Sequence, residues 1–136
     1  MQLHPYLGFQ GQCREAFTFY AALFGGRIVA MMTQADAPIA DQLPPESRHW
    51  VMHAHLVFGE QSLMGGDVPP GSPKPTGFSL NLQVDSIAEA ERLYAALADG
   101  GTPVMPIAET FWAQRFGIVH DRYGTPWMIN CLKPMP

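Results

Sequence analysis

Glu15–Gly26 reads E-A-F-T-F-Y-A-A-L-F-G-G, and the pattern returns at Glu89–Gly101 as E-A-E-R-L-Y-A-A-L-A-D-G-G. The leading Glu-Ala pairs are offset by 89 − 15 = 74 residues, and the closing glycine pairs by 101 − 26 = 75. Apolar residues recur three and four positions apart in both copies, which predicts two amphipathic helices, each ended by glycine. A repeat of about half the chain predicts two similar modules rather than a solenoid.

The sequence around each predicted helix alternates between apolar and polar residues, as strands do. We expect strands at 3–9, 27–33, 50–58 and 61–65 in the first module and at 77–84, 104–108, 115–120 and 126–132 in the second. Helices are expected at 12–24 and from a cap at Asp85 or Ser86. This order predicts an α+β fold of two tandem βαβββ modules. Together they would form a cupped, mostly antiparallel eight-stranded sheet with the helices on its convex face.

Two proline-containing segments interrupt this pattern. Asp67–Thr76 has four prolines in ten residues, which the interior of a sheet does not accept. We therefore expect a first module at 1–66, a linker at 67–76 and a second module at 77–136, together one compact domain. Gln34–Ser47 has three prolines and no period, and is predicted to be the longest loop and a candidate lid.

The bulk composition argues against several classes of protein. The net charge is −4 with only eight Lys plus Arg and no basic run, so we expect no nucleic-acid partner. No apolar stretch approaches the roughly 20 residues of a membrane helix, and the N-terminus does not resemble a signal peptide. The two cysteines, Cys13 and Cys131, are expected to be reduced in a cytoplasmic protein.

Alternation also predicts which side chains share a face. The residues expected to pack on the helices include Leu3, Leu7, Phe9, Met52, Ala54, Leu56, Phe58 and Trp127. Those expected to face a shared cleft are His4, Tyr6, His53, His55, Ser79, Asn81, Gln83, Met128 and Asn130. This second set is the predicted ligand-binding surface.

Six short motifs extend across nearly the whole chain. They are P-Y-L-x-F at 5–9, E-A-x-x-F-Y at 15–20, M-H-A-x-L at 52–56, L-M-G-x-D at 63–67, T-F-W-x-x-R-F-G at 110–117 and D-R-Y-G-x-x-W-M-I-N at 121–130. With these motifs the chain resembles the vicinal oxygen chelate superfamily of glyoxalases, bleomycin-resistance proteins and extradiol dioxygenases, and more closely its PhnB-like branch. The resemblance implies paired βαβββ modules, usually a homodimer, and in the metalloenzymes one divalent metal held by four side chains.

The four metal-ligand positions implied by the resemblance correspond here to His4, Met64 (or Leu63, if a bulge shifts the register), Ser79 and Met128. Divalent metals of this kind prefer imidazole and carboxylate ligands, and one histidine with two thioethers and a hydroxyl does not supply them. We therefore expect no metal cofactor. The alternative is a shifted zinc site of His4, His53 and His55, three imidazoles that could also act as acid and base. Against it stands the reading of these histidines as solvated or hydrogen-bonded strand residues.

Other residues have both a binding and a structural interpretation. Phe111 and Trp112 could stack on a planar ligand. Alternatively, they could close the end of the sheet or form a dimer contact. Arg115 could bind an anion, although an ion pair with an acidic residue is the stronger expectation. Asp121 is expected to hold its own turn. Cys13 would have a lowered pKa if it were exposed at a helix start.

These observations leave two functions open. The first is a protein that binds a small, partly hydrophobic or planar molecule without a metal, using His4, Tyr6, His53, His55, Ser79, Asn81, Phe111, Trp112, Arg115, Met128 and Asn130. The second is a metal-dependent lyase, isomerase or dioxygenase built on the histidines. We expect no methyltransferase activity, because the chain has no Gly-rich strand-to-helix loop for a nucleotide cofactor.

Overall fold

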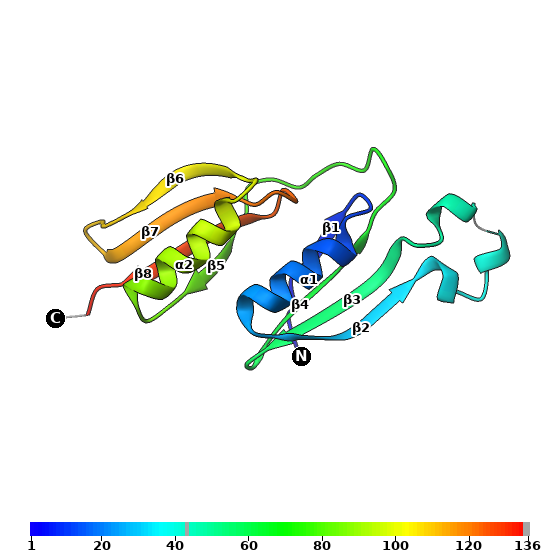
Figure 1. The fold of residues 1–136 in the computed structure, drawn as a ribbon, viewed down its shortest axis with the longest axis horizontal. Coiled ribbons are helices and arrows are strands. Elements are labelled where there is room, and N and C mark those ends of the chain that lie inside the picture. The colour runs from blue at the N-terminus through cyan, green and yellow to red at the C-terminus, as the bar shows by residue number, and fades with distance from the viewer. Residues whose placement is uncertain (43, 135–136) are drawn as a thin grey trace. The chain divides into compact units, whose positions relative to one another are not determined.

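A computed structural model describes residues 1–42 and 44–134 of the chain. Its contacts divide the chain into two compact units, 1–74 and 75–136. The first unit contains β1 (Tyr6–Phe9), α1 (Cys13–Phe24), β2 (Arg27–Thr33), β3 (Val51–Phe58) and β4 (Gln61–Asp67); the second contains β5 (Leu80–Gln83), α2 (Ile87–Ala98), β6 (Thr102–Ala108), β7 (Ala113–His120) and β8 (Pro126–Leu132). The α+β fold of two βαβββ modules is therefore confirmed (Figure 1).

Each unit has one four-stranded sheet, and the two sheets have the same topology. The strand order is β1-β4-β3-β2 in the first and β5-β8-β7-β6 in the second. The short edge pairs β1/β4 and β5/β8 are parallel, and the other pairs are antiparallel. In each unit the helix packs against one face of its own sheet (Figure 1).

The repeated apolar residues form the contact between helix and sheet. In α1, Phe17 and Tyr20 are fully buried, and in α2 Leu97 is fully buried. Ser86 caps α2 by accepting a hydrogen bond from the Glu89 amide at 3.1 Å, as predicted. No helix among residues 1–42 and 44–134 is long and apolar enough to span a membrane.

The two glycines that follow each helix have different roles. Gly25 and Gly100 have φ of 66° and 72°, left-handed values that favour glycine at a helix end. Gly26 and Gly101 have no room for a side chain. A Cβ on Gly26 would lie 2.5 Å from the Val57 carbonyl oxygen, and one on Gly101 would meet the His120 carbonyl oxygen equally closely. The second glycine therefore lets β2 and β6 start directly against their neighbouring strands.

The carboxylate of Asp67 ties three segments of the first unit together. Its Oδ1 accepts hydrogen bonds from the amides of Gly11 (2.9 Å) and Cys13 (3.1 Å), and its Oδ2 accepts one from the Val51 amide (2.8 Å). Asp67 was expected to begin the linker, but β4 runs two residues beyond the predicted end at 65 and includes it. These bonds satisfy two free amides near the start of α1.

Asp121 has a comparable role in the second unit. Its Oδ1 accepts hydrogen bonds from the amides of Tyr123 (2.9 Å) and Thr125 (3.0 Å), and its Oδ2 accepts one from the Trp127 indole N–H at 2.9 Å. The structural interpretation of Asp121 is therefore confirmed.

Three details of the first unit differ from the sequence-based expectation. β1 begins at Tyr6, so Leu3 lies outside it and is 95% exposed. A register irregularity between Met32 and Thr33 skips Met52, which is 51% exposed, and Val51 is buried in its place. The predicted loop at 34–47 contains three short 3₁₀ helices, at Gln34–Asp36, Ala40–Gln42 and Pro45–Ser47.

Cys13 is fully buried beside the Asp67 carboxylate, so the condition for a lowered pKa, exposure at the helix start, is not met. Burial, and secondarily the negative charge of Asp67, raises the pKa of the Cys13 thiol to about 12. Cys131 is also a free, buried thiol.

We expect Gly26→Ala to lower the free energy of unfolding by about 2–3 kcal/mol, because its Cβ must displace backbone in β3. Gly59→Ala is the control. A Cβ on Gly59 would meet no other atom, but the residue has a φ of 57°. The substitution should therefore lower the free energy of unfolding by only about 1 kcal/mol, the cost of placing alanine in the left-handed conformation. Urea denaturation measures both values. Equal losses for the two variants would contradict the proposed role of Gly26.

We expect a thiol reagent at pH 8 to leave Cys13 unmodified in the folded protein and to modify it in denaturant. The raised pKa lowers the thiolate fraction about a thousandfold relative to a thiol with the ordinary value of 9.0. Because the unfolded chain ionises first, the stabilisation from this neutral thiol is complete below about pH 9 and is lost as pH rises through about 12. Rapid modification of native protein, mapped to Cys13 by mass spectrometry, would refute the burial.

Candidate functional site

One face of each sheet is turned away from the helix of its own unit. A Cβ on Gly65 of β4 would meet the Phe17 ring of α1, and one on Gly117 of β7 would meet the Tyr94 ring of α2. Side chains alternate along a strand, so Met64 and Phe116, the neighbours of these glycines, point away from the helices. We call these helix-free surfaces the open faces. That of the first sheet includes Tyr6, Arg27, His53, His55, Val57, Ser62 and Met64; that of the second includes Asn81, Gln83, Met105, Ala108, Phe116, Ile118, Met128 and Asn130.

The open face of the first sheet brings together the predicted tyrosine and histidines. The rings of Tyr6 and His53 stack at 5.9 Å between centroids, and those of His4 and His55 lie 6.2 Å apart. The Tyr6 hydroxyl donates a hydrogen bond to the Met52 carbonyl oxygen at 3.2 Å. Partial burial is the main reason that the pKa of Tyr6 is raised above its ordinary value.

His4 and His55 differ in how firmly they are held. His4 precedes β1 instead of lying within it, and its Nε2 shares a 3.1 Å hydrogen bond with Gln2 Oε1. His55 lies within β3, opposite Met64, and its Nε2 shares a 3.1 Å hydrogen bond with Ser62 Oγ. His55 is therefore positioned by the sheet, whereas His4 is positioned by the segment before it.

The charge of this open face is set by a few residues. Asp67 is the one acidic residue in the strands β1–β4, and its carboxylate is bound to three amides, two of them at the start of α1. Arg27 pairs with Val57 at one end of the open face. The strands thus present imidazole, phenol and thioether groups, with a single guanidinium at the border.

The open face of the second sheet is neutral and is arranged in two rows across the strands. One row is Met105, Ile118, Met128 and Asn81; the other is Ala108, Phe116, Asn130 and Gln83. The side chains are apolar in β6 and β7 and amides in β5, whereas β8 contributes one of each, Met128 and Asn130. Ser79, the remaining predicted residue of this strand, lies immediately before β5.

Aromatic residues continue the second row at one end. The rings of Trp112 and Phe116 make an edge contact with centroids 5.1 Å apart, and Phe111 contacts Trp112 in the same way at 4.9 Å. Phe116 is buried, Trp112 is 39% exposed and Phe111 is 89% exposed. Phe116 was not predicted to be a site residue, although its pairing with Asn130 follows from the predicted β7–β8 hairpin.

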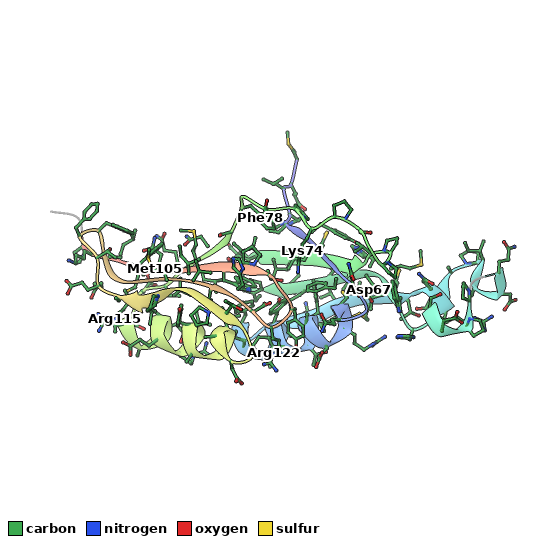
Figure 2. All side chains as sticks on the ribbon, turned by 90° about the horizontal axis from the view of Figure 1, so that it is seen from above. Asp67, Lys74, Phe78, Met105, Arg115 and Arg122 are labelled. Carbon is green, nitrogen blue, oxygen red and sulfur yellow. The ribbon has the colours of Figure 1, made fainter. Side chains whose placement is uncertain are left out.

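Arg115 does not join this surface. Its Nε donates a hydrogen bond to Glu91 Oε1 of α2 at 3.0 Å, and its Nη1 donates one to the Gln114 carbonyl oxygen at 2.7 Å. It therefore lies on the helix side of its sheet, close to α2 in Figure 2. The ion pair preferred for Arg115 is confirmed, and the structure does not bring Arg115 together with the other predicted ligand-binding residues of this sheet.

The divalent metal implied by the fold family does not fit the donors of these faces. Met64 and Met128 occupy matching positions in the two sheets, and each offers a thioether where a metal of this kind needs carboxylate or imidazole. Among residues 1–42 and 44–134, no three His, Cys, Asp or Glu side chains form a group that could hold a metal ion. His4, His53 and His55, as placed, therefore do not form such a group.

Comparison with known proteins places this geometry in a family. A family model described as 3-demethylubiquinone-9 3-methyltransferase matches residues 1–130. Protein YjdN of Escherichia coli (strain K12) is 32% identical over 145 residues, covering 100% of this chain and 99% of that protein.

Two solved structures are similar over nearly their full lengths. Protein PA1353 from Pseudomonas aeruginosa is 46% identical with a TM-score of 0.88, covering 98% of this chain and 99% of that one. A protein from Bacillus cereus described as a putative 3-demethylubiquinone-9 3-methyltransferase, PhnB protein, is 25% identical with a TM-score of 0.82, covering 96% and 99%.

More distant structures share the fold alone. A glyoxalase/bleomycin resistance protein/dioxygenase family enzyme from Burkholderia phytofirmans is 16% identical with a TM-score of 0.64, covering 96% of this chain and 97% of that one. Together with the matching family model, this fold confirms the resemblance on which the sequence analysis relied. The chain belongs to the PhnB-like family, whose model carries the description 3-demethylubiquinone-9 3-methyltransferase, and it shares its fold with glyoxalase/bleomycin resistance/dioxygenase proteins.

Proposed function

We propose that this protein binds a small, partly hydrophobic or planar molecule on its open faces, without the divalent metal usual in its superfamily. The observation that carries the proposal is the placement of Met64 and Met128 at matching central positions of the two sheets. A thioether at these positions favours contact with an apolar ligand, because methionine is polarisable and adapts to irregular shapes.

The aromatic residues support a planar ligand. Phe111 and Trp112 leave much of their rings exposed at one end of the second open face. In the first sheet, Tyr6 and His53 already stack on one another and present a further flat surface. Small-molecule sites combine such apolar walls with a few polar groups, and each open face has polar groups of its own: imidazoles on the first and amides on the second.

A metal-dependent lyase, isomerase or dioxygenase is the second candidate, and one observation favours it. His4 and His55 lie 6.2 Å apart on one face, with His53 on the same strand as His55. A shift of the segment before β1 would be needed to bring the three imidazoles onto one ion. In their present positions the three imidazoles do not form a metal-binding group, so no catalytic step is assigned to them.

Methyl transfer, which the family description names, is not part of the proposal. A nucleotide-type methyl donor needs a Gly-rich turn between a strand and a helix. Here β1 leads to α1 through Gln10-Gly11-Gln12, and β5 leads to α2 through Val84-Asp85-Ser86. Neither connection supplies that turn.

The metal-free proposal predicts that the purified protein contains no stoichiometric metal and that zinc, nickel, manganese and iron leave its melting temperature unchanged. A metal at a hundred times its Kd would raise the melting temperature by about 5 °C or more. Elemental analysis and thermal unfolding provide the readouts. If one metal binds stoichiometrically and His53→Ala abolishes binding while His49→Ala, a control outside the sheets, does not, the second candidate replaces the first.

We also propose a homodimer in the cytoplasm, with a small-molecule ligand as the one further partner. Apolar side chains such as Phe78, Val104, Phe111 and Leu132 are exposed in the second unit, and a partner surface would cover some of them. Both thiols are free, as a reducing compartment favours. Small-angle X-ray scattering at tens of micromolar is expected to give twice the chain mass of 15.0 kDa, and the mass of a single chain would overturn the dimer.

A further inference from the structure

Asn130 carries a buried acceptor that the described residues leave unused. Its side-chain Oδ1 is buried and has no hydrogen-bond partner within residues 1–42 and 44–134. Buried polar atoms almost always have a partner, so an exception in the middle of a strand needs an explanation. The backbone of Asn130 is engaged in the ordinary way, since its carbonyl oxygen accepts a hydrogen bond from the Val84 amide at 2.9 Å. Only the side chain is left for another molecule.

The position of Asn130 places this acceptor beside the aromatic residues. Asn130 lies directly opposite Phe116 in the β7/β8 pair and beside Gln83 in the β5/β8 pair. Directly paired residues hold their Cβ atoms about 4.5–5.5 Å apart on one face. Phe116 in turn contacts Trp112, whose ring is partly exposed. A flat molecule lying against Trp112 and Phe116 would therefore have its edge near Asn130.

The surroundings favour a neutral molecule. The neighbouring row consists of Met105, Ile118, Met128 and Asn81, none of which is charged. The charged groups near the aromatic residues are already paired. Lys133 binds Glu109 at 2.8 Å, and Arg115 binds Glu91 at 3.0 Å on the helix side. His120 is the one titratable residue in the strands of this face, and it lies at the far end of β7 from Trp112.

We propose that the open face of the second sheet binds a neutral aromatic molecule that carries an N–H or O–H donor. Binding moves aside the side chains that cover Phe116 and Asn130 in the free protein. The ring then lies against Trp112 and Phe116, and its donor bonds to Asn130 Oδ1. This inference rests on the proposed function and narrows it from planar molecules in general to those with a donor on the ring edge. Asn130 is the specificity-determining residue, because a carbonyl oxygen distinguishes a donor from a methyl group in the same position.

A matched pair of probes tests the proposal on the full chain. Indole has an N–H donor, and 1-methylindole has the same ring with that donor replaced. We expect the wild-type protein to bind indole about tenfold more tightly than 1-methylindole, a ratio typical of one hydrogen bond to a buried acceptor. Titrations followed by ¹⁵N–¹H NMR should shift the Trp112 indole signal and the amide signals around Asn130.

Three variants separate the contributions. Asn130→Leu should remove the preference for indole while keeping the affinity for 1-methylindole, and it should raise the melting temperature of the free protein because an unpaired acceptor is lost. Trp112→Ala should weaken both probes by a similar factor. Gln10→Leu, the same type of change in an exposed turn of the first unit, should leave the tenfold preference and the melting temperature unchanged.

The outcomes also distinguish this inference from the function on which it rests. Equal binding of the two probes, an indole preference that persists in Asn130→Leu, or no binding of indole at millimolar concentration would each overturn the inference. Planar compounds without a donor could then still bind, and the proposed function would stand. If no planar compound shifts signals on either open face, the proposed function fails together with the inference.

Discussion

The close approach of backbone at the second glycine of each pair is the constraint on which both units depend. At Gly26 and Gly101 the chain leaves a helix and passes within contact distance of a carbonyl oxygen of the neighbouring strand, with no space for a Cβ atom. The preceding glycine supplies the left-handed turn that aims the chain there. A helix of twelve residues can therefore return at once into the sheet that it covers. The position of this return determines how the following hairpin lies under the helix, and so which side chains are buried and which are left on the open face.

The two open faces share a backbone register but differ in chemistry. Tyr6, Met64, His55 and Ala30 form a row across the first sheet, and Asn81, Met128, Ile118 and Met105 form the matching row across the second. The methionine is common to both rows, whereas a phenol and an imidazole in one row correspond to an amide and an isoleucine in the other. The repeat thus preserves the interior and leaves the exposed rows free to differ, as expected when packing constrains one side of a sheet and ligand chemistry the other.

Local patterns predicted the elements well because helix spacing and strand alternation are local properties. The helix at 12–24 was correct to within one residue, and the strand at 126–132 was correct at both ends. The errors have non-local causes. Met52 was placed on the wrong face because an irregularity in the β2–β3 pairing reverses the alternation. The ion-pair partner of Arg115 could not be named from the sequence, because Glu91 lies 24 residues away on α2. The role of Asp67 depends on amides up to 56 residues away, which no local pattern reveals.

The outer strands of the two sheets also determine whether further strands can be added to them. An edge strand offers unpaired amides that another chain can use to extend the sheet. β6 carries Pro103 and Pro106, which have no N–H to offer, and its pairing with β7 is irregular between Pro103 and Ala108. β2 has no proline but is interrupted at Val29 and near Thr33, and such bulges twist an edge away from a regular partner. The opposite edges, β1 and β5, are only four residues long. Each sheet is thereby protected against ribbon-like growth into aggregates, even though apolar side chains such as Val29 and Val104 are exposed along these edges.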